Sequence, residues 1–340
     1  MKNLNIKDIA KLAGVGVSTV SRVINQHHDV KEETRKHVLE VIEKYNYIPN
    51  NSARNLKRSD SMDIGILIKG MYNPLFARIV EIMEKQLTYS DYSVVIHYNN
   101  DGQRDIDTAN EFVLEKKLCG LICLGGDFDE VQDEDVIRLG VPLVLTSTQI
   151  PTEVDQALFS SASIDNEDAA ARAVYFLHDL GHRNIGLITT GVDDKSVGTI
   201  RTAGYLRALE ERGLPKKENY FEVGAYTFET GYEAMQRLLK KAPDLTAVFA
   251  ISDMMAIGAA KAAMDAGLRI PEDLSIMGFD DIDYAAFYHP TLTTMHQPVD
   301  EMAQSTAEMI VDILDDHAAN RHEVFSTELK KRASTRIFEE

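Results

Sequence analysis

The sequence predicts a small all-α head followed by an α/β body, and three observations lead to this fold class. Near the N-terminus, apolar residues recur at helical spacing on both sides of a short turn that contains glycines. From Ile64 onward, short β-rich segments alternate with amphipathic segments, which is typical of parallel sheets covered by helices on both faces. The alternation runs through two successive series, so the body should form two similar lobes, each with a doubly wound parallel sheet.

The first predicted helix is short and ends at a glycine. Its apolar stripe, at spacing i, i+3, i+4 and i+7, consists of Ile6, Ile9, Ala10 and Ala13. Gly14 follows the stripe and suits the left-handed conformation that often terminates a helix. A second helix should begin near Val17, with Gly16 as a permissible N-cap.

The second predicted helix has one buried side and one polar side. Val20 and Ile24 should point into the core. The polar stripe consists of Ser18, Ser21, Arg22 and Asn25. A third helix should run from about residue 31 to residue 45, and these three helices match the helix-turn-helix arrangement, whose second helix enters the major groove of DNA. A helical bundle with a solvated polar face would show the same pattern.

The second helix also carries side chains that suit contact with bases. Arg22 could donate two hydrogen bonds to guanine O6 and N7, and Val17 could touch a thymine methyl group. Residues 1–60 hold 11 Lys and Arg against 7 Asp and Glu, a formal charge of +4, whereas the remaining residues carry −22. Nucleic acid is therefore a natural partner for the head and not for the body.

These residues resemble a known family. The stretch "IKDIAKLAGVGVSTVSRVIN" is similar to the DNA-binding head of the LacI family of transcriptional regulators. Gly16 departs from the family pattern, which usually has Ser there, so a capping hydroxyl and a phosphate contact are missing. The resemblance implies a helix-turn-helix domain over residues 1–48. Its DNA-binding residues would be Val17, Ser18, Thr19, Ser21, Arg22 and Asn25.

Residues 49–61 form a separate segment. Pro49 should end the third helix, and Asn50 can cap a short helix over residues 51–56. On its own this segment is typical of a charged linker. The resemblance instead implies a hinge helix that pairs with its two-fold mate and inserts an apolar wedge into the minor groove. The residues placed there would be Ala53, Leu56 and Lys57.

The body, residues 62–340, should contain eight strands before its last segment. They are predicted at 63–70, 92–98, 120–126, 141–147, 184–191, 220–226, 246–253 and 274–280. Helices are predicted near 75–89, 104–116, 199–213, 228–242 and 253–266. The last segment, 292–335, should add a strand, a helix and a strand, so that the chain returns once to each lobe. The N-terminal lobe would then hold about 62–161 and 292–320, and the C-terminal lobe about 162–291 and 321–340.

A ligand should bind between the lobes, because open α/β sheets bind ligands at the carboxyl ends of their strands. Segments 201–214, 270–281 and 289–298 resemble LacI-family effector domains, which are akin to periplasmic sugar-binding proteins. The resemblance implies an effector site made by Phe76, Lys195, Arg201, Tyr226 and Asp280. A sugar is the expected effector, although Ser252, where some sugar-binding members carry Asn, leaves purines and nucleosides open. Read without the family, these residues could be an ordinary ion pair, a turn cap and core aromatics.

Several function classes find no support in the sequence. The nucleotide-binding, zinc-protease and serine-hydrolase motifs are missing, so we expect neither an enzyme nor a cofactor. The ten histidines lack metal-ligand spacing, and Cys119 and Cys123 lie too far apart along one strand for a disulfide. No apolar run approaches the roughly 18 residues of a membrane span, and no secretory signal is present, so we expect a cytoplasmic protein.

The sequence thus predicts a sequence-specific transcriptional repressor whose affinity for a pseudo-palindromic operator is controlled by a small ligand. The chain ends at "RIFEE" without a heptad tail, which favours a homodimer over a tetramer. Three alternatives stay open at this point. They are a solute-binding protein, an α/β enzyme with an accessory DNA-binding domain, and a regulator that uses a protein corepressor.

Overall fold

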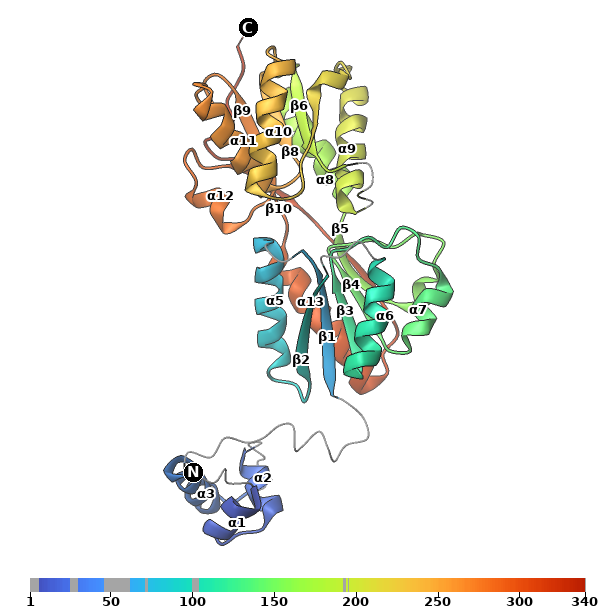
Figure 1. The fold of residues 1–340 in the computed structure, drawn as a ribbon, viewed down its shortest axis with the longest axis vertical. Coiled ribbons are helices and arrows are strands. Elements are labelled where there is room, and N and C mark those ends of the chain that lie inside the picture. Colours follow the sequence, from blue (N-terminus) through green and yellow to red (C-terminus); the bar gives the residue numbers. More distant parts are fainter. Residues whose placement is uncertain are drawn as a thin grey trace. The chain divides into compact units, whose positions relative to one another are not determined.

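The computed structural model describes residues 6–24, 30–45, 62–70, 73–99, 104–191, 194 and 196–339 (Figure 1). The chain divides into two compact units, Met1–Ser61 and Met62–Glu340. Among the helices described, none has the length and apolar character needed to cross a membrane.

The head is a bundle of three helices, α1 (Ile6–Leu12), α2 (Val17–Ile24) and α3 (Glu32–Lys44). Gly14 adopts a left-handed φ of +64°, and the next amide, that of Val15, donates to the Ala10 carbonyl at 3.0 Å. This turn confirms the predicted stop after α1. The core of the head consists of Ile9, Ala10, Ala13, Val20, Val23, Val38 and Val41. The predicted burial of Val20 is therefore confirmed, whereas the side chain of Ile24 lies outside the described residues.

The N-terminal lobe of the body contains a six-stranded parallel sheet of order β11-β5-β4-β3-β1-β2. Its strands are β1 (Asp63–Lys69), β2 (Ser93–Asn99), β3 (Gly120–Leu124), β4 (Leu143–Thr146), β5 (Ser160–Ile164) and β11 (His322–Phe325). One face packs on α5 (Pro74–Leu87) and α13 (Val299–Asp316), and the other on α6 (Asp105–Lys116) and α7 (Asp133–Leu139). The lobe therefore has the predicted doubly wound architecture.

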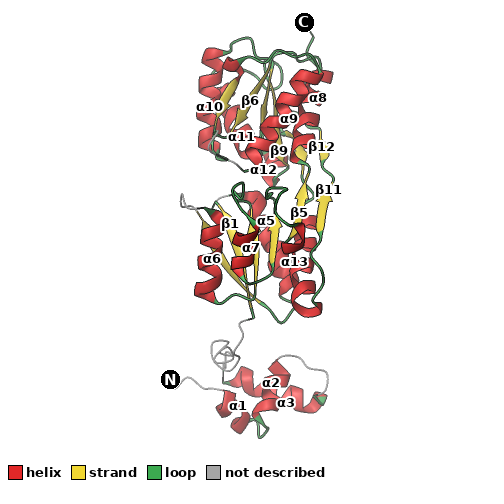
Figure 2. Ribbon diagram, turned by 90° about the vertical axis from the view of Figure 1, so that its right-hand side faces the viewer, coloured by secondary structure: helices red, strands yellow, loops and turns green. Residues whose placement is uncertain are grey.

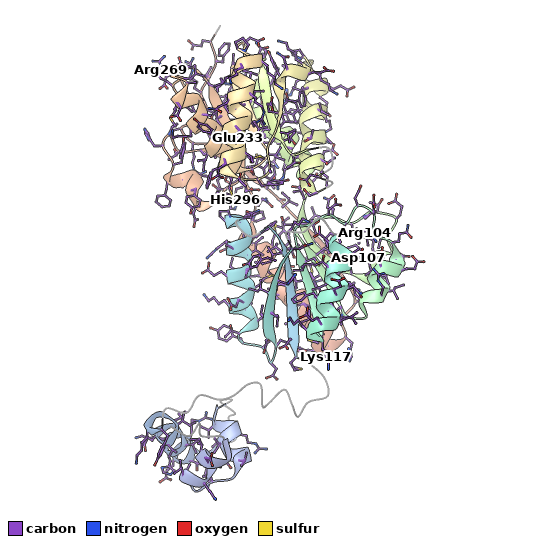
Figure 3. All side chains as sticks on the ribbon, viewed as in Figure 1. Arg104, Asp107, Lys117, Glu233, Arg269 and His296 are labelled. Atoms are coloured by element: carbon purple, nitrogen blue, oxygen red, sulfur yellow. The ribbon has the colours of Figure 1, made fainter. Side chains whose placement is uncertain are left out.

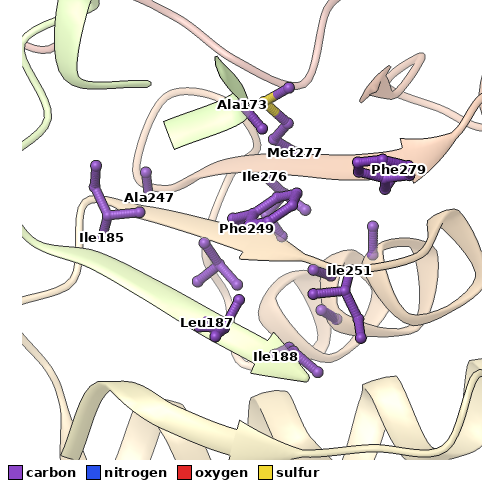
Figure 4. Packing of buried hydrophobic residues seen from close by; sticks show 14 of the residues in the cluster. Ala173, Ile185, Leu187, Ile188, Ala247, Phe249, Ile251, Ile276, Met277 and Phe279 are labelled. Atoms are coloured by element: carbon purple, nitrogen blue, oxygen red, sulfur yellow. The ribbon is translucent and has the colours of Figure 1, made fainter. Parts of the chain in front are cut away.

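The C-terminal lobe contains a second six-stranded sheet, of order β12-β10-β9-β8-β6-β7, in which only β12 is antiparallel to its neighbour. Its strands are β6 (Ile185–Thr189), β7 (Phe221–Val223), β8 (Ala247–Ala250), β9 (Ser275–Asp280), β10 (Thr293–His296) and β12 (Glu328–Lys330). Its helices are α8 (Asn166–Asp179), α9 (Val197–Glu211), α10 (Phe228–Lys241), α11 (Asp253–Asp265) and α12 (Asp283–Phe287). Phe249 of β8 and Met277 of β9 lie in its buried apolar core (Figure 4).

The last part of the chain differs from the prediction. β10 pairs with β9, so residues 293–296 belong to the C-terminal lobe and not to the N-terminal one. β11 pairs with β5 and belongs to the N-terminal lobe, and β12 then returns to the other sheet (Figure 2). The predicted boundaries at 292 and 321 were wrong because strands of three or four residues show no pattern that reveals their distant partner.

The last segment contains one strand more than predicted, and four further elements were absent from the prediction. They are β5, α7, α8 and α12. β5 consists of three Ser, one Ala and one Ile, and α12 has only five residues, so neither provides a strong periodic signal. The three chain crossings between the lobes therefore lie near residue 165, at 297–298 and at 326–327, all beside the carboxyl ends of strands.

Candidate functional site

The exposed face of α2 in the head is the first candidate site. Val17 is 41% exposed although it lies one turn from the fully buried Val20. Arg22 is exposed and Thr19 half-buried. An apolar residue and an arginine thus lie outside the core of an otherwise amphipathic helix, which suits contact with a partner.

The remaining predicted DNA contacts cannot be placed. The side chains of Ser18 and Ser21 lie outside the described residues, as does Asn25. The same holds for the whole predicted hinge segment, with Ala53, Leu56 and Lys57.

The second candidate site lies at the carboxyl ends of the strands in the C-terminal lobe. Arg201 on α9 and Asp280 at the end of β9 are both buried, and Nη1 of Arg201 donates to Oδ1 of Asp280 at 3.1 Å. The guanidinium also lies over the Phe279 ring, 3.7 Å from its centroid. Two residues that are 79 positions apart in the sequence are thereby brought together, as the family resemblance implied.

Further polar groups fix this pair. Nε of Arg201 donates to the Asn166 side chain at 2.9 Å, and Nη1 also donates to the Ile251 carbonyl at 2.7 Å. The Gln297 amide donates to Oδ1 of Asp280 at 2.7 Å. Burial raises the pKa of Asp280, while Arg201 and Gln297 oppose that shift. Asn166 and Gln297 were not predicted, because only the folded chain brings them to this pair.

Tyr226 lies beside the first turn of α9. A Cβ added to Gly198 would lie 2.8 Å from the Tyr226 hydroxyl and 2.2 Å from Oγ1 of Thr190, so glycine permits this close approach. Both hydroxyls are buried, and neither makes a hydrogen bond of normal geometry within the described part of the chain. Burial raises the pKa of Tyr226 to about 12, so the phenol is neutral and can donate to a ligand.

The facing lobe contributes an aromatic ring and a charged pair. The Phe76 ring on α5 covers Gly125, whose added Cβ would lie 2.7 Å from the ring. Lys69, at the carboxyl end of β1, donates to Oδ1 of Asp105 at 3.1 Å. The buried Asp105 also accepts from the Asn99 amide and, at 2.7 Å, from the Asp127 backbone. Sequence patterns gave no signal for Lys69 or Asp105.

Two cavities are lined by both lobes. A cavity of about 440 Å³ lies between residues 148–153, which follow β4, and the first turn of α9, whose next turn carries Arg201. A larger one of about 1150 Å³ lies between α5 and α12 and includes His296 (Figure 3). Lys195, predicted to lie over the cleft, is outside the described residues. Within the described ranges, no group of His, Cys, Asp and Glu could hold a metal ion.

The chain is similar to known regulators over nearly its whole length. A family profile described as "Bacterial regulatory proteins, lacI family" matches residues 5–50, and one described as "Periplasmic binding protein-like domain" matches residues 174–335. The HTH-type transcriptional regulator MalR of Clostridium butyricum is 43% identical over 333 residues, which are 97% of this chain and 99% of that protein. Catabolite control protein A of Priestia megaterium is 35% identical over 87% of this chain and 88% of its own length.

Solved structures extend the similarity to the fold. A lac repressor dimer bound to operator and the anti-inducer ONPF aligns with a TM-score of 0.77 at 26% identity, covering 98% of this chain and 100% of that one. A complex of the transcriptional regulator CelR with cellobiose aligns with a TM-score of 0.70 at 28% identity, covering 97% and 99%.

Proposed function

The chain belongs to the LacI family of bacterial transcriptional regulators, and from this premise we propose that it is a dimeric, sugar-controlled repressor acting in the cytoplasm. Its head binds an operator, and an effector binds between the lobes of its body. The main observation in support of effector binding is the buried ion pair of Arg201 and Asp280 at the carboxyl ends of the strands in the C-terminal sheet.

The head contacts DNA through α2. Arg22 reads a base in the major groove, Val17 makes an apolar contact, and Thr19 contributes a hydroxyl. Ser18, Ser21 and Asn25 extend this contact to bases and phosphates. Ala53, Leu56 and Lys57 bind the minor groove at the centre of the operator. The exposure of Val17 and Arg22 supports this assignment.

The effector is a neutral sugar. Both side-chain bonds to Asp280 end on Oδ1, which leaves Oδ2 to accept from a sugar hydroxyl. Tyr226 supplies a further hydroxyl and an aromatic face, Phe76 covers the ligand from the other lobe, and Lys195 also contacts the effector. Two cationic side chains of this site lie in the described part of the chain, Arg201 and Lys69, and each is paired with a carboxylate. This pairing favours a neutral ligand over a phosphate. The cellobiose complex of CelR supports this ligand class.

Two copies of the chain form the functional unit. Large apolar side chains are exposed on the edge strand β2, at Ile96 and Tyr98, and on α12, where Phe287 is 88% exposed. A second copy that covers them would place two heads on one two-fold axis, as a pseudo-palindromic operator requires. The dimeric state of the operator-bound lac repressor supports this assembly.

The effector acts by shifting the balance between two lobe arrangements. A ligand that binds one arrangement more tightly stabilises it, and the coupling to operator affinity is then typically about 1–3 kcal/mol. No chemical step is needed, and we propose that the protein does not act as an enzyme.

The test uses the full-length protein. Operator fragments are selected from genomic DNA in the presence of bulk competitor, and neutral sugars, sugar phosphates and purines are screened by thermal shift. We expect one selected fragment to bind well above competitor and one neutral sugar to change that affinity by 5- to 150-fold, the range that corresponds to the coupling above. If the protein prefers no fragment over competitor DNA, the proposal of a sequence-specific regulator is refuted. Chemical turnover of the bound sugar would instead favour an enzyme.

A further inference from the structure

Asp253, the first residue of α11, carries a fully buried carboxyl group that the proposed function does not use. Each of its oxygens accepts one hydrogen bond from a described residue. Oδ1 accepts from the Thr294 hydroxyl at 2.6 Å, and Oδ2 accepts from the Ile282 backbone amide at 2.9 Å. β9 approaches it closely, since a Cβ on Gly278 would lie 2.2 Å from Oδ1. Burying an acid costs free energy, so its presence at this position indicates that the position matters.

The Ile282 amide ends a strained turn. Asp280 and Asp281 have φ values of +114° and +59°, in the region that non-glycine residues rarely adopt. Residues in this conformation are strained and persist only where their surroundings hold them. Here the turn is held at each residue. Arg201 and Gln297 bond to Asp280. His296 and Arg332 bond to Asp281, at 3.0 and 2.6 Å. Asp253 accepts from Ile282.

The same turn reaches into the other lobe. Ile282, 6% exposed, belongs to the apolar cluster of the N-terminal lobe, together with Leu75 and Ile79 of α5. Met254, which follows Asp253 in the chain, belongs to that cluster as well. Asp253 therefore links two residues that the C-terminal lobe inserts into its neighbour, and the turn it fixes begins with the effector-binding carboxylate.

We propose that Asp253 is a positioning residue that couples the effector site at Asp280 to the joint between the lobes, formed by Ile282 and Met254. A shift of Asp280 on effector binding moves Ile282 because the turn is fixed at both ends. The joint then changes the lobe arrangement. This inference rests on the proposed function and adds to it the route by which the effector regulates the lobe arrangement.

The experiment compares Asp253→Ala, which removes both acceptor oxygens, with Asp265→Ala in full-length protein. Asp265 lies in the same helix, but its carboxylate is exposed and contacts Lys261 and Tyr232 far from the turn. Binding of a neutral sugar found in the thermal-shift screen is measured by calorimetry. Operator affinity with and without that sugar is measured by fluorescence anisotropy, and the ratio of the two is the coupling factor. Amide exchange of Ile282 reports the hydrogen bond directly.

We expect Asp253→Ala to bind the sugar and the operator, to exchange the Ile282 amide at least tenfold faster, and to bring the coupling factor at least fivefold closer to one. Asp265→Ala should match wild type in every one of these measurements. A wild-type coupling factor in Asp253→Ala overturns the inference, and so does loss of sugar binding in a folded variant. If Asp253→Ala does not fold, Thr294→Val, which removes only the bond to Oδ1 and leaves the Ile282 bond in place, tests the coupling factor alone, and a wild-type factor there overturns the inference. If the proposed function itself is wrong, the outcome is different, because the wild-type protein would then bind no sugar or no operator.

Discussion

The substitution Gly198→Ala tests the proposed effector site through a single methyl group. The added Cβ would lie 2.2 Å from Oγ1 of Thr190, 2.8 Å from the Tyr226 hydroxyl and 3.2 Å from Cδ1 of Ile251. Contacts this short require both hydroxyls to move. The helix itself would not suffer, since Ala favours a helix over Gly by about 1 kcal/mol.

The expected effect follows from the cost of overpacking. An extra methyl group in a packed site costs about 1–3 kcal/mol. If this cost falls on the effector-bound state, the Kd for the sugar rises by about 5- to 150-fold. Calorimetric titration of the sugar measures this change, and operator affinity without sugar should stay within twofold of wild type because α2 lies in a separate compact unit.

Gly191→Ala provides the matched control. Gly191 follows Thr190 directly, but a Cβ there would meet only Cγ1 of Val223, at an ordinary 3.8 Å. Sugar affinity in this variant should equal that of wild type. Wild-type affinity in Gly198→Ala, or an equal loss in both variants, would refute the placement of Tyr226 and Thr190 in the effector site.

Three further predictions concern the pH dependence of stability, the DNA contact of Arg22 and the effector response. His182 is buried between Thr246 and the Arg336 carbonyl, and burial lowers its pKa from 6.5 to about 4. The folded state then binds fewer protons than the unfolded state between those values, so stability is lost as the pH falls through this window, by about 2 kcal/mol at pH 5. Chemical denaturation at pH 7 and pH 5 should show this loss in wild type and not in His182→Gln, and equal losses would contradict the reasoning. Arg22→Ala should lose about 1–3 kcal/mol of operator binding and relax preference at one base pair of each half-site. Equal weakening on random DNA would instead make Arg22 a phosphate contact. Asp280→Asn should abolish the response to sugar and leave operator binding intact in anisotropy titrations, and a normal response would remove Asp280 from the site.

Local pattern sufficed for most of the fold. The three helices of the head have helical periodicity, and β1, β3 and β9 are continuous buried runs, so their positions follow from the sequence. The prediction was wrong where pairing over long distance decides. β10 and β11 are short and could have joined either sheet, and their place depends on contacts with β9 and β5. The proposed effector-site residues Arg201 and Asp280 came from a family resemblance, whereas their partners Asn166 and Gln297 required the folded chain.

Backbone strain points to the same site without any reference to the family. Six non-glycine residues have positive φ among those described, and two of them, Lys117 and His317, simply end helices. The other four are Ser147, Tyr226, Asp280 and Asp281. All four lie at or shortly after the carboxyl ends of β4, β7 and β9. Strain of this kind persists only where other contacts compensate it, and it concentrates where a protein must hold side chains ready for a ligand. The buried hydroxyls of Thr190 and Tyr226 lie at the same edge of the C-terminal sheet. A chain selected only for stability would have relaxed these turns, so the strained residues at the strand ends favour a ligand site there.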